Sequence, residues 1–216
     1  MSYFFELCVA LSYGLQYTVG LFFITALLSL PLGFGLTFMR NSKFVVFRAF
    51  ASFYVWIMRG TPLLLQLFFI YFGLPFIPVI GEYMILDRFP AACVAFVLNY
   101  AAYFCEIFRG GLLSIGKGQY EAAKVLGLSK AQTTTKIVIP QMLKVTLPSI
   151  SNECITLVKD TALITAIGVT EIMFYAKGVV NRDVNAAAYG VAALFYLLMN
   201  FVLSKLFDKL EKKYCY

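Results

Sequence analysis

The chain has 216 residues, of which 61% are hydrophobic and only 13% are charged, and its mean hydropathy is +0.82. A soluble domain carries about 25% charged residues, so a single aqueous core cannot bury this much apolar surface and a lipid environment is expected. The net charge of +7 gathers between hydrophobic runs, as in cytoplasmic loops of membrane proteins, which argues against a nucleic-acid partner. Histidine is absent and the five cysteines form no CxxC pair, so no metal or redox site is predicted.

The uncharged stretches define the predicted elements. They cover residues 7–39, 60–81, 89–105 and 184–204. The first is too long for one span of about 20 residues, and we interpret its start as an amphipathic N-terminal segment at 1–14 that leads into a span. The runs are continuous rather than alternating, and lipid requires every backbone polar group to be satisfied internally, so helices are expected.

Five transmembrane helices follow in chain order, and Pro31 could kink the first. Their predicted bounds are residues 19–39, 51–72, 89–108, 141–170 and 184–203. The glycines and prolines of 73–88 predict a loop, and the polar stretch 109–140 separates the third span from the fourth. The sequence therefore predicts an all-α membrane protein with a transmembrane domain at 15–210 and a cytoplasmic tail at 211–216.

Lysine and arginine are distributed unequally between the two sides of these spans. Thirteen lie on one side, three on the other, and Arg59 and Lys159 fall inside hydrophobic regions. The enriched side is expected to be cytoplasmic. Five spans then place the N-terminus outside and the C-terminus in the cytoplasm.

The polar stretch itself predicts a helix, a glycine corner and a second helix. Helix-forming residues occupy 119–126, and Gly127 is a natural helix stop. Ser129 followed three residues later by Gln132 fits a capping box that starts a helix near Lys130. A short helix of this kind can present one face to a groove on a partner, and the alternative is an amphipathic loop lying at the lipid surface.

The same stretch resembles the EAA signature of ABC importer permeases. The matching residues are Glu121, Ala122, Ala123, Gly127 and Pro140, although isoleucine at 139 stands where leucine often precedes the proline. Further runs resemble the polar amino-acid permease subfamily of the histidine, glutamine and arginine type: RGTPLLLQ at 59–66, EIFRGG at 106–111, GKGQ at 116–119 and LVKDT at 157–161. The resemblance covers residues 15–210.

This resemblance implies a type I ABC importer transmembrane domain in the bacterial inner membrane. Two permease subunits, identical or related, would pair, and two ATP-binding subunits would dock below them through the Glu121–Gly127 helix. An extracytoplasmic solute-binding protein would deliver the amino-acid substrate. The chain itself would bind no cofactor and carry no catalytic residue, because ATP and magnesium would belong to the partner ATPase.

The run GLLSIGKG at 111–118 nearly matches a phosphate-binding P-loop. That pattern needs serine or threonine after the lysine to ligate magnesium, and here Gly118 occupies the position. The preceding residues are typical of a membrane helix rather than a β-strand. We therefore interpret the run as a flexible connector, and ATP chemistry is expected on another polypeptide.

Charged and polar residues inside the spans fall into two groups. A charge at mid-bilayer costs at least about 2.5–3.5 kcal/mol and therefore usually faces protein or water. A structural role is expected for Arg59, Glu106 and Arg109, where Glu106 and Arg109 are spaced to pair on one helix face, and for Lys159. The candidate substrate path consists of Asn99, Asn152, Glu153 and Asp160, and interhelical hydrogen bonding is the alternative role for these four.

Two other classes of function are alternatives to the importer subunit. An ion-coupled secondary carrier or channel would also use intramembrane ionisable groups, but it would not need a cytoplasmic helix–glycine–helix segment. A membrane enzyme is poorly supported, because the sequence offers neither histidine nor a metal-ligand cluster. Association with an ATPase separates the first alternative from the importer.

Overall fold

The computed structural model describes residues 2–79 and 81–214, and every regular element in this part of the chain is helical. The long helices are α1 (Ser2–Arg40), α2 (Val45–Gly60), α4 (Arg88–Ser114), α7 (Ile139–Asp160), α8 (Ile172–Asp183) and α9 (Ala187–Tyr214). The shorter ones are α3 (Leu63–Phe68), α5 (Lys117–Val125) and α6 (Lys130–Thr133). Single turns of 3-10 or π-helix continue several of them, at Phe69–Gly73, Leu74–Phe76, Gly81–Met84, Thr134–Val138 and Thr161–Ile167.

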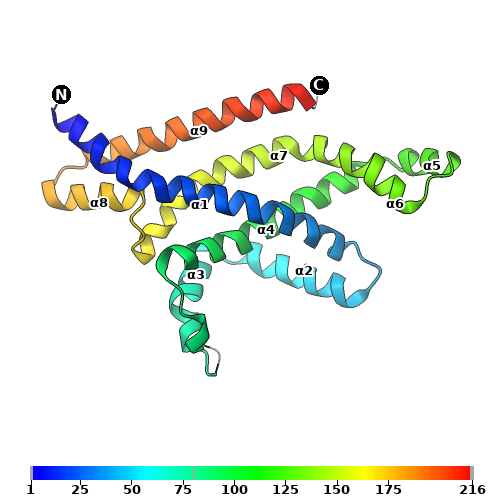
Figure 1. Cartoon of the computed structure of the whole chain (residues 1–216), viewed down its shortest axis with the longest axis horizontal. Helices are drawn as coiled ribbons and strands as arrows, with labels where there is room; N and C mark the ends of the chain where they lie inside the picture. Colours follow the sequence, from blue (N-terminus) through cyan, green and yellow to red (C-terminus); the bar gives the residue numbers. More distant parts are fainter. Residues whose placement is uncertain (1, 80, 215–216) are drawn as a thin grey trace.

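The long helices lie roughly lengthwise in an elongated molecule, whereas α3 and the turns after it descend across that direction (Figure 1). The start of α1, helix α8 and the start of α9 occupy one end, while α5 and α6 project at the opposite end. The core lies where α1 and α7 pack against α4, around fully buried side chains such as Leu21, Phe96, Phe104 and Met142. A second cluster joins α1, α8 and α9 around Leu11, Ile172 and Ala188, and it closes the first end.

Three helices are each long and apolar enough to cross a bilayer: Tyr3–Arg40, Arg88–Ser114 and Ala187–Tyr214. Two helix pairs are long and apolar enough to cross a bilayer only when their members are taken together, and each pair is bent at a short break. The pair at 45–76 bends by 105° and the pair at 130–183 bends by 56°. By length and composition the described residues therefore contain three candidate spans, or up to five when each bent pair counts as one.

The helices do not follow all of the predicted bounds. Residues 2–14 are no separate segment, because α1 continues without a break through Pro31 to Arg40. The predicted span at 51–72 is interrupted after Gly60, where Pro62 lacks the N–H that a continuing helix would use. The predicted tail is also helical, since α9 extends to Tyr214, and residues 215–216, with Cys215, lie outside the described residues.

Helix α8 was missed altogether. Lys177, Arg182 and Asp183 lower its hydropathy, so it resembled a connecting segment in the sequence. It begins at a buried carboxylate, because Glu171 caps it by accepting a hydrogen bond from the Phe174 N–H at 2.8 Å. An acidic side chain is favourable at that position because it satisfies a free N–H and faces the positive end of the helix dipole.

Candidate functional site

Helix α5 ends in a glycine-dependent corner. The N–H of Leu128 donates to the carbonyl of Ala123 at 3.0 Å, and the N–H of Gly127 donates to that of Lys124 at 3.0 Å. This pair of bonds is the Schellman arrangement, which requires a left-handed residue after the helix. Gly127 meets that requirement with φ of +73°, a conformation that costs L-residues about 1–2 kcal/mol. The predicted glycine stop is confirmed.

The chain after the corner starts a new helix at the predicted place. The Ser129 hydroxyl accepts from the Gln132 N–H at 3.2 Å, and the Gln132 side chain accepts from the Ser129 N–H at 2.8 Å. The capping box is therefore confirmed. Helix α6 continues through a π-turn into α7, and Pro140 lies directly after that π-turn.

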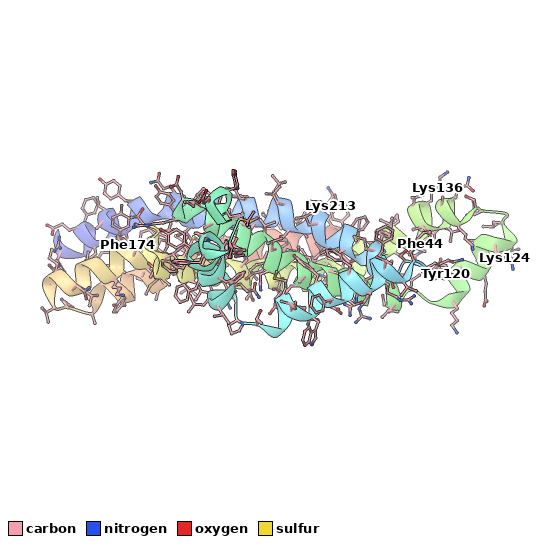
Figure 2. The ribbon with its side chains drawn as sticks, turned by 90° about the horizontal axis from the view of Figure 1, so that it is seen from below. Phe44, Tyr120, Lys124, Lys136, Phe174 and Lys213 are labelled. Atoms are coloured by element: carbon pink, nitrogen blue, oxygen red, sulfur yellow. The ribbon has the colours of Figure 1, made fainter. Side chains whose placement is uncertain are left out.

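Most of the signature residues are exposed at the tip of this segment. Glu121, Ala122 and Gly127 are exposed, whereas Ala123 is fully buried. The two apolar residues at the corner, Val125 and Leu126, are 87% and 75% exposed. Lys124, Tyr120 and Lys136 lie at this end of the molecule, opposite the end that carries Phe174 (Figure 2). The segment thus presents apolar and basic side chains away from the helical core.

A hollow of about 630 Å³ lies between α5 and α6. Its lining combines the basic side chains of Lys124 and Lys130 with Tyr120 and hydroxyl-bearing residues.

The P-loop resemblance at 111–118 has no structural counterpart. Residues up to Ser114 belong to α4, and only Ile115 and Gly116 separate α4 from α5, so helix rather than strand precedes the turn. Gly111 serves close packing instead, because a Cβ there would lie 2.9 Å from the Met142 side chain of α7. The interpretation of this run as a flexible connector holds only for Ile115 and Gly116, because the rest of the run is helical.

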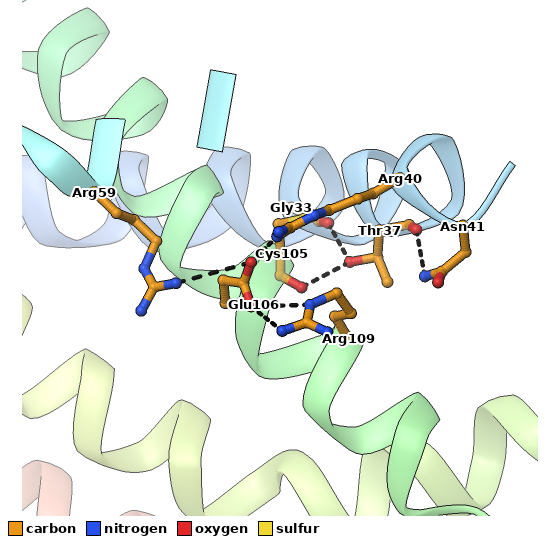
Figure 3. Close-up of polar contacts among 8 residues, drawn as sticks. All are labelled: Gly33, Thr37, Arg40, Asn41, Arg59, Cys105, Glu106 and Arg109. Atoms are coloured by element: carbon orange, nitrogen blue, oxygen red, sulfur yellow. Dashed lines mark hydrogen bonds and ion pairs between the residues drawn. The ribbon is translucent and has the colours of Figure 1, made fainter. Parts of the chain in front are cut away.

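A charge cluster joins α1, α2 and α4 around Glu106 (Figure 3). Arg109 donates to Glu106 Oε2 from Nε at 2.9 Å and from Nη2 at 2.7 Å, which confirms the predicted pair. Arg40 contacts Oε1, and Arg59 Nη1 lies 3.8 Å from the same atom. Arg40 was missed because its partner is far away in sequence. The side chain of Glu106 is only 15% exposed, so three cations surround one nearly buried carboxylate.

Asn99 belongs to a buried hydrogen-bond network at the break between α2 and α3. Its Nδ2 donates to the carbonyl of Met58 and to Gln66 Oε1, each at 3.0 Å. Gln66 Nε2 in turn donates to the carbonyls of Met58 and Thr61 and to the Thr61 hydroxyl. The network satisfies carbonyls that the helix break leaves free, and these contacts favour the interhelical alternative for Asn99.

The other three path candidates lie on two faces of α7. Glu153 and Asp160 are both half-buried, whereas Asn152 and Lys159 are both exposed. Residues seven apart share a helix face, so the acidic pair faces the interior of the molecule and the other pair faces away from it. Asp160 accepts a hydrogen bond from the Tyr100 hydroxyl of α4 at 2.7 Å. The structure thus places Glu153 and Asp160 on one face of α7, whereas Asn99 bonds to residues at the α2–α3 break.

Glu171 is a buried polar residue that sequence reasoning missed. It is 0% exposed, and besides capping α8 it accepts hydrogen bonds from the Thr165 hydroxyl at 2.9 Å and the Tyr196 hydroxyl at 2.8 Å. These bonds tie the 3-10 turn after α7 to α8 and α9. The useful signal would have been an acidic residue directly before the helix-forming run at 172–183.

Comparison with known proteins decides the family. The family model of the binding-protein-dependent transport system inner membrane component matches residues 29–214. The chain belongs to this family. Among curated members, this inner membrane component is 37% identical to the octopine transport system permease protein of Rhizobium radiobacter over 97% of the chain and 88% of that protein. It is 38% identical to an arginine transport system permease protein of Bacillus subtilis over 93% of this chain and 90% of that protein.

A solved structure gives the same answer for the fold. A crystal structure of an amino-acid ABC transporter with histidines superposes with a TM-score of 0.86 at 31% identity, covering 94% of both chains. The recognised family and the ABC importer fold are therefore confirmed. Membership also confirms the inner membrane as the location of this transport component.

Proposed function

We propose that this chain is the membrane-spanning permease subunit of an ATP-driven amino-acid importer and that its ATPase docks at the Glu121–Gly127 helix. The exposed corner of α5 carries the proposal. Val125 and Leu126 are apolar and unburied at a protruding tip that is otherwise basic. An amphipathic helix that inserts into a partner's groove has this composition.

The proposed topology counts each bent pair as one span. Five spans place the start of α1 outside and the end of α9 in the cytoplasm, on the same side as α5 and α6. The basic residues at the end of α1, in α5 and α6 and at the end of α9 support this orientation, because cytoplasmic segments are enriched in lysine and arginine.

The proposed assembly contains two permease subunits, identical or related, and two ATP-binding subunits beneath them. ATP and magnesium are held by the ATPases, and this chain contributes the path through the membrane. A solute-binding protein delivers substrate at the outer end, where α1, α8 and α9 meet. Family membership supports this composition, since the family is that of binding-protein-dependent transport systems.

Within the membrane we propose that Glu153 and Asp160 carry the substrate contacts. Both carboxyl groups lie half-buried on one face of α7, where they suit an ammonium or guanidinium group. Asn152 remains a candidate on the exposed face, and Asn99 is assigned to the helix break. The named relatives transport octopine, arginine and, in a further Bacillus subtilis protein, cystine, which supports an amino acid as substrate.

The test is reconstitution. The chain is co-expressed with its ATPase and binding protein, and uptake of labelled amino acids into proteoliposomes is measured with and without ATP. Uptake that follows an imposed ion gradient in the absence of the ATPase would instead support a secondary carrier.

Substitution then tests the path. Glu153→Gln is expected to raise the KM for uptake, whereas Asp208→Asn, on an exposed face of α9, should leave uptake unchanged. Equal kinetics for Glu153→Gln and wild type with every amino acid tried would remove Glu153 from the path.

A further inference from the structure

A second hollow, of about 620 Å³, lies where the start of α4 meets α1 and the turns that follow α3 and α7. Two charged side chains, those of Asp87 and Arg88, line it together with Tyr17 and Tyr71. Sites for small molecules measure about 300–1,000 Å³ and combine apolar walls with a few convergent polar groups. The hollow therefore has the size and the lining of a site for a small charged molecule.

Arg88 is fixed on the wall of this hollow by Gly168. Its Nη1 donates to the Gly168 carbonyl at 3.2 Å. A Cβ at Gly168 would lie 3.1 Å from Nη1 and 3.3 Å from Cζ, so a side chain there would press on the guanidinium. A guanidinium carries five N–H donors in a planar fork, and one bond to a carbonyl leaves it able to bind a carboxylate as well. Arg88 is thus a held cation that can still take an anionic group.

Asp87 occupies the N-cap position of α4 without capping the helix. Its side chain makes no capping hydrogen bond to α4, all of whose residues the structure describes. Glu171, at the same position of α8, does accept such a bond. The Asp87 side chain is exposed and lines the hollow instead. A carboxylate and a guanidinium on adjacent residues of one wall suit a ligand that carries both charges, such as a zwitterion.

The hollow lies on the outer side of the Glu153–Asp160 pair in the proposed topology. Helix α4 begins at Arg88 and runs toward α5, which faces the cytoplasm in that topology (Figure 1). Tyr100, which donates to Asp160, follows Arg88 by about twelve residues, roughly 18 Å along the helix. An amino acid entering from outside would reach the hollow before the acidic pair.

We propose that this hollow is an outer binding site for a free α-amino acid, in which Arg88 binds the α-carboxylate and Asp87 binds the α-ammonium group. The rings of Tyr17 and Tyr71 provide aromatic walls against which an aliphatic or cationic side chain can pack. The two charges bind groups that all amino acids share, so this site holds the backbone of the substrate rather than selecting its side chain. The inference rests on the proposed function.

The test is equilibrium binding of L-arginine and L-argininamide to the purified permease–ATPase complex without the binding protein, at about pH 6.5, where both probes keep a charged α-amine. The amide lacks the carboxylate charge, so wild type should prefer L-arginine about tenfold or more. Arg88→Gln should bring this preference close to one, whereas Asp87→Asn should weaken binding of both probes alike. Lys177→Gln is the matched control, because it removes an exposed positive charge of α8 that does not line the hollow, and it should keep the wild-type preference.

Glu153→Gln separates this site from the inner acidic pair, because it should leave the preference for the carboxylate intact. An Arg88→Gln complex that keeps the full preference overturns the outer site, as does a wild-type complex that binds both probes equally or binds neither. If Arg88→Gln does not assemble, Arg88→Lys takes its place. It keeps the positive charge but loses the fork, so its preference should be intermediate, and a wild-type preference in this variant would overturn the site.

Two parallel measurements separate the remaining explanations. Loss of binding-protein association in Arg88→Gln with an unchanged preference between the probes would make the hollow a docking surface and overturn the amino-acid site. ATP-driven uptake by the wild-type complex is measured in proteoliposomes. A complex with such uptake that fails the binding test refutes the outer site alone, whereas a complex without such uptake refutes the proposed function.

Discussion

Gly33 of α1 lies directly against the backbone of Ala101 in α4. A Cβ at Gly33 would stand 2.8 Å from the Ala101 carbonyl oxygen and 3.0 Å from the Cys105 amide nitrogen. Close approach of this kind lets two membrane helices pack along their backbones. The Thr37 hydroxyl, one turn further on, uses the same contact to donate to the Cys105 carbonyl at 3.1 Å. The α1–α4 contact at Gly33 therefore leaves no room for a larger side chain.

Gly33→Val should destabilise the subunit by about 1–3 kcal/mol, because backbone atoms cannot rotate away from the added methyl groups. The measurement is the melting temperature of the purified complex in detergent. Gly35→Val is the control, since nothing lies within 4 Å of a Cβ at Gly35 and the change in helix propensity is the same. Equal melting temperatures would contradict the close contact.

Gly127→Val should lower substrate-stimulated ATP hydrolysis while the complex stays assembled, because a β-branched residue resists the left-handed conformation at the corner. Gly127→Asn is the informative companion. Asparagine tolerates this conformation, so most of the stimulation should survive. If both variants lose stimulation equally, the glycine is required for space at the docking surface rather than for the turn.

Asn99→Leu should cost about 1–3 kcal/mol of stability, because it leaves Gln66 Oε1 buried without its donor. The KM for uptake should not change if Asn99 only locks the α2–α3 break. Asn152→Leu, on the exposed face of α7, should leave the melting temperature nearly unchanged. A raised KM with unaltered melting in Asn99→Leu would return this residue to the substrate path.

Glu171→Leu should destabilise the end of the molecule formed by α1, α8 and α9 through two losses. The cap of α8 contributes about 0.5–2 kcal/mol, and the stranded hydroxyls of Thr165 and Tyr196 cost about 1–3 kcal/mol each. Glu171→Gln keeps one acceptor oxygen and should melt between Leu and wild type. If the melting temperature of Glu171→Gln is as low as that of Glu171→Leu, the negative charge itself is required.

The features predicted well from sequence depend on neighbours in the chain. The corner at Gly127, the capping box at Ser129 and the Glu106–Arg109 pair all join residues within about one helical turn, so spacing alone reveals them. The α-helical class followed equally directly from composition.

The features that were missed depend on distant partners. Arg40 and Glu106 are far apart in the chain, as are Tyr100 and Asp160, and no local pattern predicts that they meet. The broken second span was missed for a different reason. Its hydropathy is uninterrupted across Pro62, and only the Gln66–Asn99 network explains how the freed carbonyls are tolerated in an apolar setting. Site residues that face one another across helices therefore needed the structure.

The length of α1 has a mechanical consequence. Its 39 residues measure about 58 Å at 1.5 Å per residue, longer than the roughly 40–45 Å of a whole bilayer. One end is fastened to α8 by the hydrogen bond from Tyr3 to Asp183, and the other to α4 by the contact of Arg40 with Glu106. Because α1 is a continuous helix held at both ends, it takes up little displacement within its own length. A tilt imposed at the α8 end of α1 must therefore reappear at the contact of Arg40 with α4.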